Sequence, residues 1–266
     1  MENKQEPQTA EIKPKERWTE RLEGPTDLLV SAVNIYRQKI VKILALYGIA
    51  VLSFVPLAVV FGLYWLMGDG MDGTTRAILQ TVLGVAGIIS LFCVVFYNIA
   101  VQAAVYLAPE SAESEKIMEL FKRGRSLAGK YFLVSFLVGI FTLLWTLLLI
   151  VPGIIMSVYY SFAGLCLIYE GYRAGKALKR SKELTKGYWW AVVGRSLFLG
   201  LLVWLFMMVF SIPLWVVDEN SVVADIWSWV VNLVSYLVAP VGMIYSYLIF
   251  KNLQKIKGER KAEMQR

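Results

Sequence analysis

The sequence of 266 residues contains no histidine, only two cysteines and only 18% charged residues. The lack of histidine excludes histidine-based catalytic triads and most metal sites, and two cysteines cannot form a disulfide framework. Soluble domains carry ~25% charged and ~45–50% apolar residues, whereas 58% of this chain is hydrophobic. The composition therefore excludes a soluble globule and a disordered chain, and it indicates an integral membrane protein.

Long apolar segments predict six transmembrane helices. A helix needs about 20 apolar residues to cross a bilayer core of ~30 Å, and the uncharged segment 131–169 is long enough for two such helices. Pro152-Gly153 would form the hairpin turn between them, because proline cannot continue a helix and glycine permits a tight reversal. We therefore predict an all-α membrane protein with spans at residues 43–67, 77–106, 131–151, 154–169, 188–217 and 226–250.

Lysine and arginine are concentrated in alternate connections. They precede the first span, separate the second from the third and the fourth from the fifth, and follow the sixth, while Arg76 is the only basic residue in the other three connections. Because positively charged connections remain in the cytoplasm, both termini are expected to be cytoplasmic. Residues 1–25 would form a disordered cytoplasmic tail, 26–252 a single transmembrane domain and 253–266 a basic cytoplasmic tail.

Three segments on the cytoplasmic side have apolar residues at helical spacing, which predicts amphipathic interfacial helices over residues 29–40, 117–127 and 174–184. The second and third segments match at a shift of 57 residues. Two interpretations of this match remain open. Either any two basic interfacial helices that precede a span would show such a match, or a unit of interfacial helix plus hairpin is repeated three times. The matched pairs are Lys122 with Lys179, Arg123 with Arg180, Leu127 with Leu184, and Tyr131 with Tyr188.

The basic residues of these segments are candidate contacts for anionic lipid, because a juxtamembrane lysine or arginine contributes roughly 1 kcal/mol of attraction to the inner leaflet. Topology and this attraction account for the net charge of +7, and no basic folded surface suggests a nucleic-acid partner. The candidate lipid contacts are Lys122, Arg123, Arg125, Lys176, Lys179, Arg180, Lys182 and Lys186.

Two pairs of polar residues lie at or within the predicted spans. Glu170 and Arg195 both belong to cytoplasmic halves, and a charge in the membrane is costly unless it is paired or reaches the interface. They would form an ion pair that fixes packing, or they would bind a lipid headgroup. Asn98 and Gln102 are four residues apart and share a helix face, where they would form interhelical hydrogen bonds or line a polar path.

The stretch from Val151 to Gly194 resembles a bacterial and archaeal family of six-span proteins. That family includes the membrane domain that precedes some glycerophosphodiester phosphodiesterases, and the related YciC-like proteins. The resemblance implies a six-span fold and the cytoplasmic membrane of a prokaryote. Only 16 residues follow Phe250, too few for a TIM barrel of ~250 residues, so phosphodiesterase activity is not expected. The matching residues are Pro152-Gly153, Glu170, Ser181, Leu184, Gly187 and Trp189-Trp190.

The sequence favours a non-enzymatic function without a cofactor, since it has no paired acids at membrane depth, no glycine-rich phosphate loop and no zinc ligand set. The first hypothesis is a lipid-organising protein or a membrane scaffold. Its partners would be the anionic lipids of the inner leaflet and a membrane protein or a second copy of the chain. The alternative is a small-molecule or lipid transporter with a cytoplasm-facing cavity near Glu170, Arg195, Asn98 and Gln102.

Overall fold

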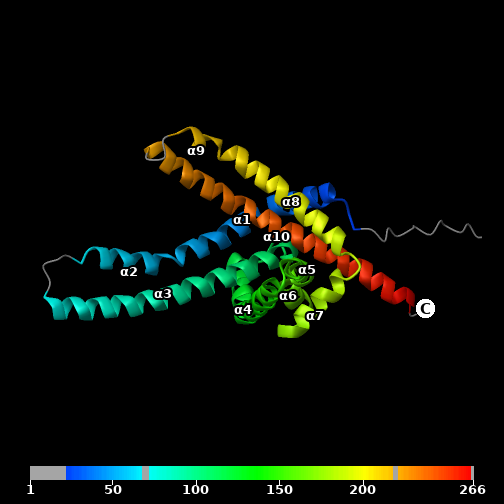
Figure 1. Ribbon diagram of the computed structural model, residues 1–266, viewed down its shortest axis with the longest axis horizontal. Coiled ribbons are helices and arrows are strands. Elements are labelled where there is room, and N and C mark those ends of the chain that lie inside the picture. Colours follow the sequence, from blue (N-terminus) through cyan, green and yellow to red (C-terminus); the bar gives the residue numbers. More distant parts are fainter. Residues whose placement is uncertain (1–21, 68–71, 218–220, 265–266) are drawn as a thin grey trace, which may run out of the picture.

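The computed structural model describes residues 22–67, 72–217 and 221–264, and these residues form helices and short connections without a strand (Figure 1). Six helical stretches are long and apolar enough to cross a membrane, which confirms the predicted all-α class and the number of spans. The elements are α1 (Pro25–Leu52), α2 (Val55–Trp65), α3 (Gly73–Leu107), η1 (Ala108–Glu110), α4 (Ile117–Leu148), α5 (Ile150–Tyr160), α6 (Ala163–Glu170), α7 (Ala174–Thr185), α8 (Trp189–Phe210), α9 (Ile212–Val216) and α10 (Val222–Met264).

Prolines account for several helix starts. Pro56 stands in the first turn of α2 and Pro213 in the first turn of α9, where the missing N–H costs nothing because the first turn has no carbonyl partner for it. The first span is therefore divided into α1 and α2, and a short α9 follows α8. Pro240 lies inside α10, which continues past it without a break.

The hairpin turn lies three residues before its predicted position. α4 ends at Leu148, and the extended Leu149 (φ −162°, ψ 138°) connects it to α5. Pro152 and Gly153 instead belong to the first turn of α5, since proline starts a helix more readily than it closes a reversal. Gly153 still has a geometric role. A Cβ at this position would lie 2.7 Å from Cα of Thr146, so glycine permits α4 and α5 to approach closely.

The fourth span is interrupted, which the sequence did not predict. α5 ends at Tyr160 and α6 begins at Ala163, with a turn at Ser161 and Phe162. Ser181 of α7 stabilises this break: its hydroxyl accepts a hydrogen bond from the Phe162 N–H at 3.1 Å and donates one to the Tyr159 carbonyl at 2.7 Å. Ser181 is fully buried, so α7 is inserted against the interrupted span.

Only the third of the predicted interfacial segments is a separate helix. α7 ends before Gly187, whose φ of 89° turns the chain into α8, whereas the first two segments are the beginnings of the long helices α1 and α4. The predicted apolar side of α7 is buried, but it packs against the protein helices α4, α5, α6 and α10. In the first segment Ala32 is buried, and of the predicted face Leu29, Tyr36 and Ile40 are half-buried while Val33 is exposed.

The two predicted tails lie at the ends of the described chain. The prediction of disorder over residues 1–25 falls mostly on residues 1–21, which lie outside the described residues. Leu22 is buried in the core, and Pro25 already belongs to α1. α10 continues as a helix through the predicted basic tail as far as Met264.

The core lies where the helices converge, and the hairpins separate away from it. The buried residues come from both halves of α1, the end of α3, the start of α4, α6, α7, the first half of α8 and the second half of α10. α2 has no buried residue. Figure 1 shows the α2–α3 pair and the α8–α9–α10 group pointing in different directions, with α4 seen nearly along its axis. We call the side of the molecule where the helices converge the basic end, because the basic segments lie there.

Candidate functional site

A group of seven polar side chains joins the helices at the basic end, and we call it the polar layer. It couples the interrupted fourth span to α7, to the end of α3 and to α10. Each member takes part in a hydrogen bond, an ion pair or a cation–π contact within the group. The members are Glu110, Tyr169, Glu170, Arg180, Tyr247, Lys251 and Gln254.

Glu170 is the acceptor of one half of the polar layer. Its carboxylate accepts hydrogen bonds from Nε of Arg180 at 2.8 Å, from Nη2 of Arg180 at 3.0 Å and from Nε2 of Gln254 at 2.7 Å. The side chains of Glu170 and Arg180 are only 15% and 21% exposed. The Glu170 carboxylate raises the pKa of Arg180 above its ordinary value by hydrogen bonding to the charged form. This bidentate ion pair joins α7 to the last residue of α6. The hydrogen bond from Gln254 joins α10 to the same residue.

Glu110 is the acceptor of the other half. Oε1 of Glu110 forms an ion pair with the Lys251 ammonium at 2.6 Å and accepts a hydrogen bond from the Tyr247 hydroxyl at 2.8 Å. The same ammonium lies 4.7 Å from the centre of the Tyr169 ring, a cation–π contact. The Tyr169 hydroxyl in turn donates to the Tyr106 carbonyl at 2.5 Å. These contacts tie η1 and the end of α3 to α6 and α10.

Of the two alternatives for Glu170 and Arg195, the ion pair between them is not found, because each side chain has other partners. Arg195 donates to the carbonyl oxygens of Leu22 and Glu23, both at 2.6 Å from Nη2, and to the Ala191 carbonyl at 2.9 Å from Nη1. The physical reason is position: α7 carries Arg180 directly to Glu170, whereas α8 carries Arg195 to the segment before α1. Arg195 thus fixes the start of the first helix and takes no part in the polar layer.

Asn98 and Gln102 do not share one environment. Asn98 is half-buried and donates to the Val94 carbonyl at 2.8 Å and to the Ser53 hydroxyl at 3.5 Å, which joins α3 to the break between α1 and α2. Gln102 is exposed. The two side chains lie one turn apart on α3, and only Asn98 has the predicted interhelical bond.

The candidate lipid contacts are exposed with one exception. Arg180 is half-buried in its pair with Glu170, so it is not available to a headgroup. Arg123 is 55% exposed and also reaches Glu115 at 2.9 Å. The remaining candidates are exposed on α4, on α7 and just after α7: Lys122, Arg125, Lys176, Lys179, Lys182 and Lys186.

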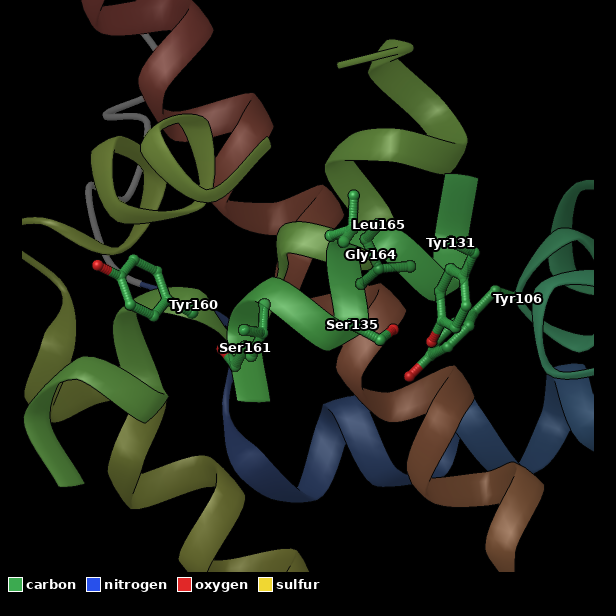
Figure 2. A pocket seen from close by; sticks show the side chains of 9 residues that line it. Tyr106, Tyr131, Ser135, Tyr160, Ser161, Gly164 and Leu165 are labelled. Carbon is green, nitrogen blue, oxygen red and sulfur yellow. The ribbon is translucent and has the colours of Figure 1, made fainter. Parts of the chain in front are cut away.

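A cavity of about 160 Å³ lies beside the break in the fourth span (Figure 2). Figure 2 shows Tyr106, Tyr131 and Ser135 gathered on one side of it, with Ser161 of the break further along. Tyr106 comes from α3, Tyr131 and Ser135 from α4, and Gly164 from α6. The cavity lining carries hydroxyl groups and no charged side chain. Neither Asn98 nor Gln102 is among its lining residues.

Sequence reasoning named Ser181 as part of the family resemblance but did not predict its hydrogen bonds to the break in the fourth span. Other residues of the site were missed. Glu110, Lys251 and Gln254 gave no signal that separates them from ordinary residues at the end of a span. Among the residues that the structure describes, no three His, Cys, Asp or Glu side chains could hold a metal ion. No family model, no curated protein and no solved structure matches the chain.

Proposed function

We propose that this chain is a multi-pass protein of the prokaryotic cytoplasmic membrane that organises anionic lipid, or a partner protein, at its basic end. Both termini would face the cytoplasm, as the distribution of Lys and Arg predicts, and no enzymatic step is part of this proposal. The suggested membership in the six-span family of the phosphodiesterase membrane domain agrees with this architecture. The six apolar helices support the membrane location.

The observation that carries the proposal is the construction of α7. Its apolar side is buried against other helices and Arg180 anchors it to Glu170, while Lys176, Lys179 and Lys182 are exposed. The position of α7 is thus fixed by the protein, and its exposed lysines are available to lipid without any folding of the helix on the membrane. Because its position is already set by the protein, little ordering entropy opposes the binding of anionic headgroups.

A change of lysines tests this proposal. We expect that replacing Lys176, Lys179 and Lys186 by glutamine reduces the preference of the reconstituted protein for phosphatidylglycerol over phosphatidylcholine. Three charges at roughly 1 kcal/mol each would lower the preference by up to about a hundredfold. The measurement is the composition of the lipid that co-purifies with the protein from mixed vesicles.

The matched control replaces the same three lysines by arginine, which keeps the charge and should keep the preference. Arg180 is left intact in both variants because its loss would disturb the packing of α7. An unchanged lipid preference in the glutamine variant would contradict the organisation of anionic lipid by the basic end.

A transporter is the second candidate, and the broken fourth span supports it. Discontinuous helices at membrane depth form the binding sites of many transporters, and here the break lies beside the hydroxyl-lined cavity. In this alternative the path would include Tyr131, Ser135 and Ser161. Gln102 would not belong to it, because this side chain is not among the residues that line the cavity.

A further inference from the structure

An apolar groove of about 410 Å³ lies between α5 and the start of α8. Trp190 on one wall is 80% exposed, and the neighbouring Trp189 donates its indole N–H to the Ile155 carbonyl at 3.2 Å. This hydrogen bond holds α8 against α5 and fixes the shape of the groove. The lining residues are Val151, Ile154, Ile155, Tyr159, Trp189 and Trp190.

A cation lies at one end of this groove. The ammonium of Lys182, on α7, lies 5.7 Å from the centre of the Tyr159 ring, and Tyr159 is the lining residue of α5 nearest to α7 in the chain. From Tyr159 to Val151 the helix rises by about 12 Å. The groove is therefore elongated, apolar along its length and positively charged at one end.

This arrangement matches the chemistry of a phospholipid. Tryptophan and tyrosine favour the boundary between headgroups and acyl chains, and an exposed lysine there reaches toward phosphate while its stem stays on apolar surface. The lining residues and Lys182 include no carboxylate, so nothing among them would attract the positive amine of a zwitterionic headgroup.

We propose that this groove is a binding site for one anionic phospholipid, with an acyl chain against α5 and the phosphate beside Lys182. The inference rests on the proposed function and sharpens it, since it assigns one lipid to one place instead of a diffuse cloud of lipid to a charged face. Lys182 then differs in role from the other exposed lysines of α7.

Two lysines three residues apart on α7 allow a matched test. The full chain is reconstituted in mixed phosphatidylglycerol and phosphatidylcholine, and native mass spectrometry counts the molecules that retain one lipid. We expect Lys182→Gln to lower the retained phosphatidylglycerol about fivefold, the ratio for the loss of one juxtamembrane charge. Lys179→Gln removes the same charge from an exposed position outside the groove lining and should leave this retention nearly unchanged.

A second pair of variants tests the apolar part. Ile154 is 56% exposed, so Ile154→Trp fills the groove without disturbing the core and should abolish retention of the lipid. Leu143 of α4 is 67% exposed outside the groove, and Leu143→Trp is the control that should keep it. A lipid that remains bound to the Ile154→Trp variant would overturn the proposal.

The outcomes separate the site from the proposed function. Equal losses for Lys179→Gln and Lys182→Gln would overturn the site and leave a diffuse attraction to anionic lipid. No loss in either variant would also overturn the site, and the lipid preference of the triple lysine variant then decides whether the proposed function survives.

Discussion

At the scale of single residues, the charged groups of this chain are explained by their partners. A carboxylate at the end of an apolar helix is costly unless it is paired, and Glu170 meets this requirement with three hydrogen-bond donors from two helices. Breaking such a pair leaves the remaining charge unmatched, so each partner alone is expected to matter more than the net contribution of the pair. The same reasoning applies to Arg195, whose charge is satisfied by main-chain carbonyls.

We predict that a double-mutant cycle separates the two arginines. Glu170→Gln and Arg180→Gln should be coupled by about 1–3 kcal/mol in the free energy of unfolding, because the side chains are in direct contact. Glu170→Gln and Arg195→Gln should be additive within about 0.5 kcal/mol. The measurement is unfolding in mixed micelles. Strong coupling of Glu170 to Arg195 would show that the sequence-based pair is the correct one.

At the scale of helices, the contact between α3 and α4 depends on small residues. Ala100 and Ala104 of α3 are fully buried, and a Cβ on Gly124 of α4 would lie 2.5 Å from the Ala100 carbonyl oxygen and 2.7 Å from the Ala104 Cβ. Close approach through small residues is the usual way in which helices pack where no hydrophobic force drives them together. The contact therefore fixes the position of α4, and with it the cavity beside the break.

We predict that Gly124→Ala destabilises the protein by about 1–3 kcal/mol, the usual cost of inserting a methyl group into a packed contact. Gly129 lies on the same helix with open space around it, so Gly129→Ala is the control. It should be neutral, or stabilising by up to about 1 kcal/mol through helix propensity. The readout is the thermal midpoint of both variants in the same detergent, and equal midpoints would contradict the packing described here.

At the scale of the whole molecule, the helices converge at the basic end and separate beyond it (Figure 1). The apolar windows of the α1–α2, α3 and α8 spans bury 11–17% of their residues within the chain, and the window of α10 buries 33%. In a membrane, the exposed apolar side chains of both groups of helices would contact acyl chains.

Cysteine cross-linking tests this separation, with Cys93 and Cys166 replaced by serine. A pair of cysteines at Val60 of α2 and Gly87 of α3 should form a disulfide, because a Cβ at Gly87 would lie 3.7 Å from the Val60 side chain. A pair of cysteines at Leu63 of α2 and Leu205 of α8 should not form a disulfide. The helices α2 and α8 lie apart (Figure 1), and the Cα atoms of a disulfide must lie within about 7 Å of each other. Efficient cross-linking of the second pair in lipid vesicles would show that the hairpins close.

The sequence by itself determined the class of the protein and the number of its spans. Apolar segments of sufficient length must become helices in a bilayer, because only a helix satisfies every backbone polar group within one segment. The apolar side of α7 was predicted for a similar reason, since helical spacing alone places Ala177, Leu178 and Leu184 on one face.

The tertiary structure decided which residues meet. The sequence suggested Arg195 as the partner of Glu170. The turn at Leu149, the break at Ser161–Phe162 and the docking of Ser181 instead bring Arg180 to it. Arg195 donates hydrogen bonds to the segment before α1, more than 170 residues away in sequence. Such partners depend on the directions in which helices leave a shared core. A local pattern of spacing and hydropathy contains no information about those directions.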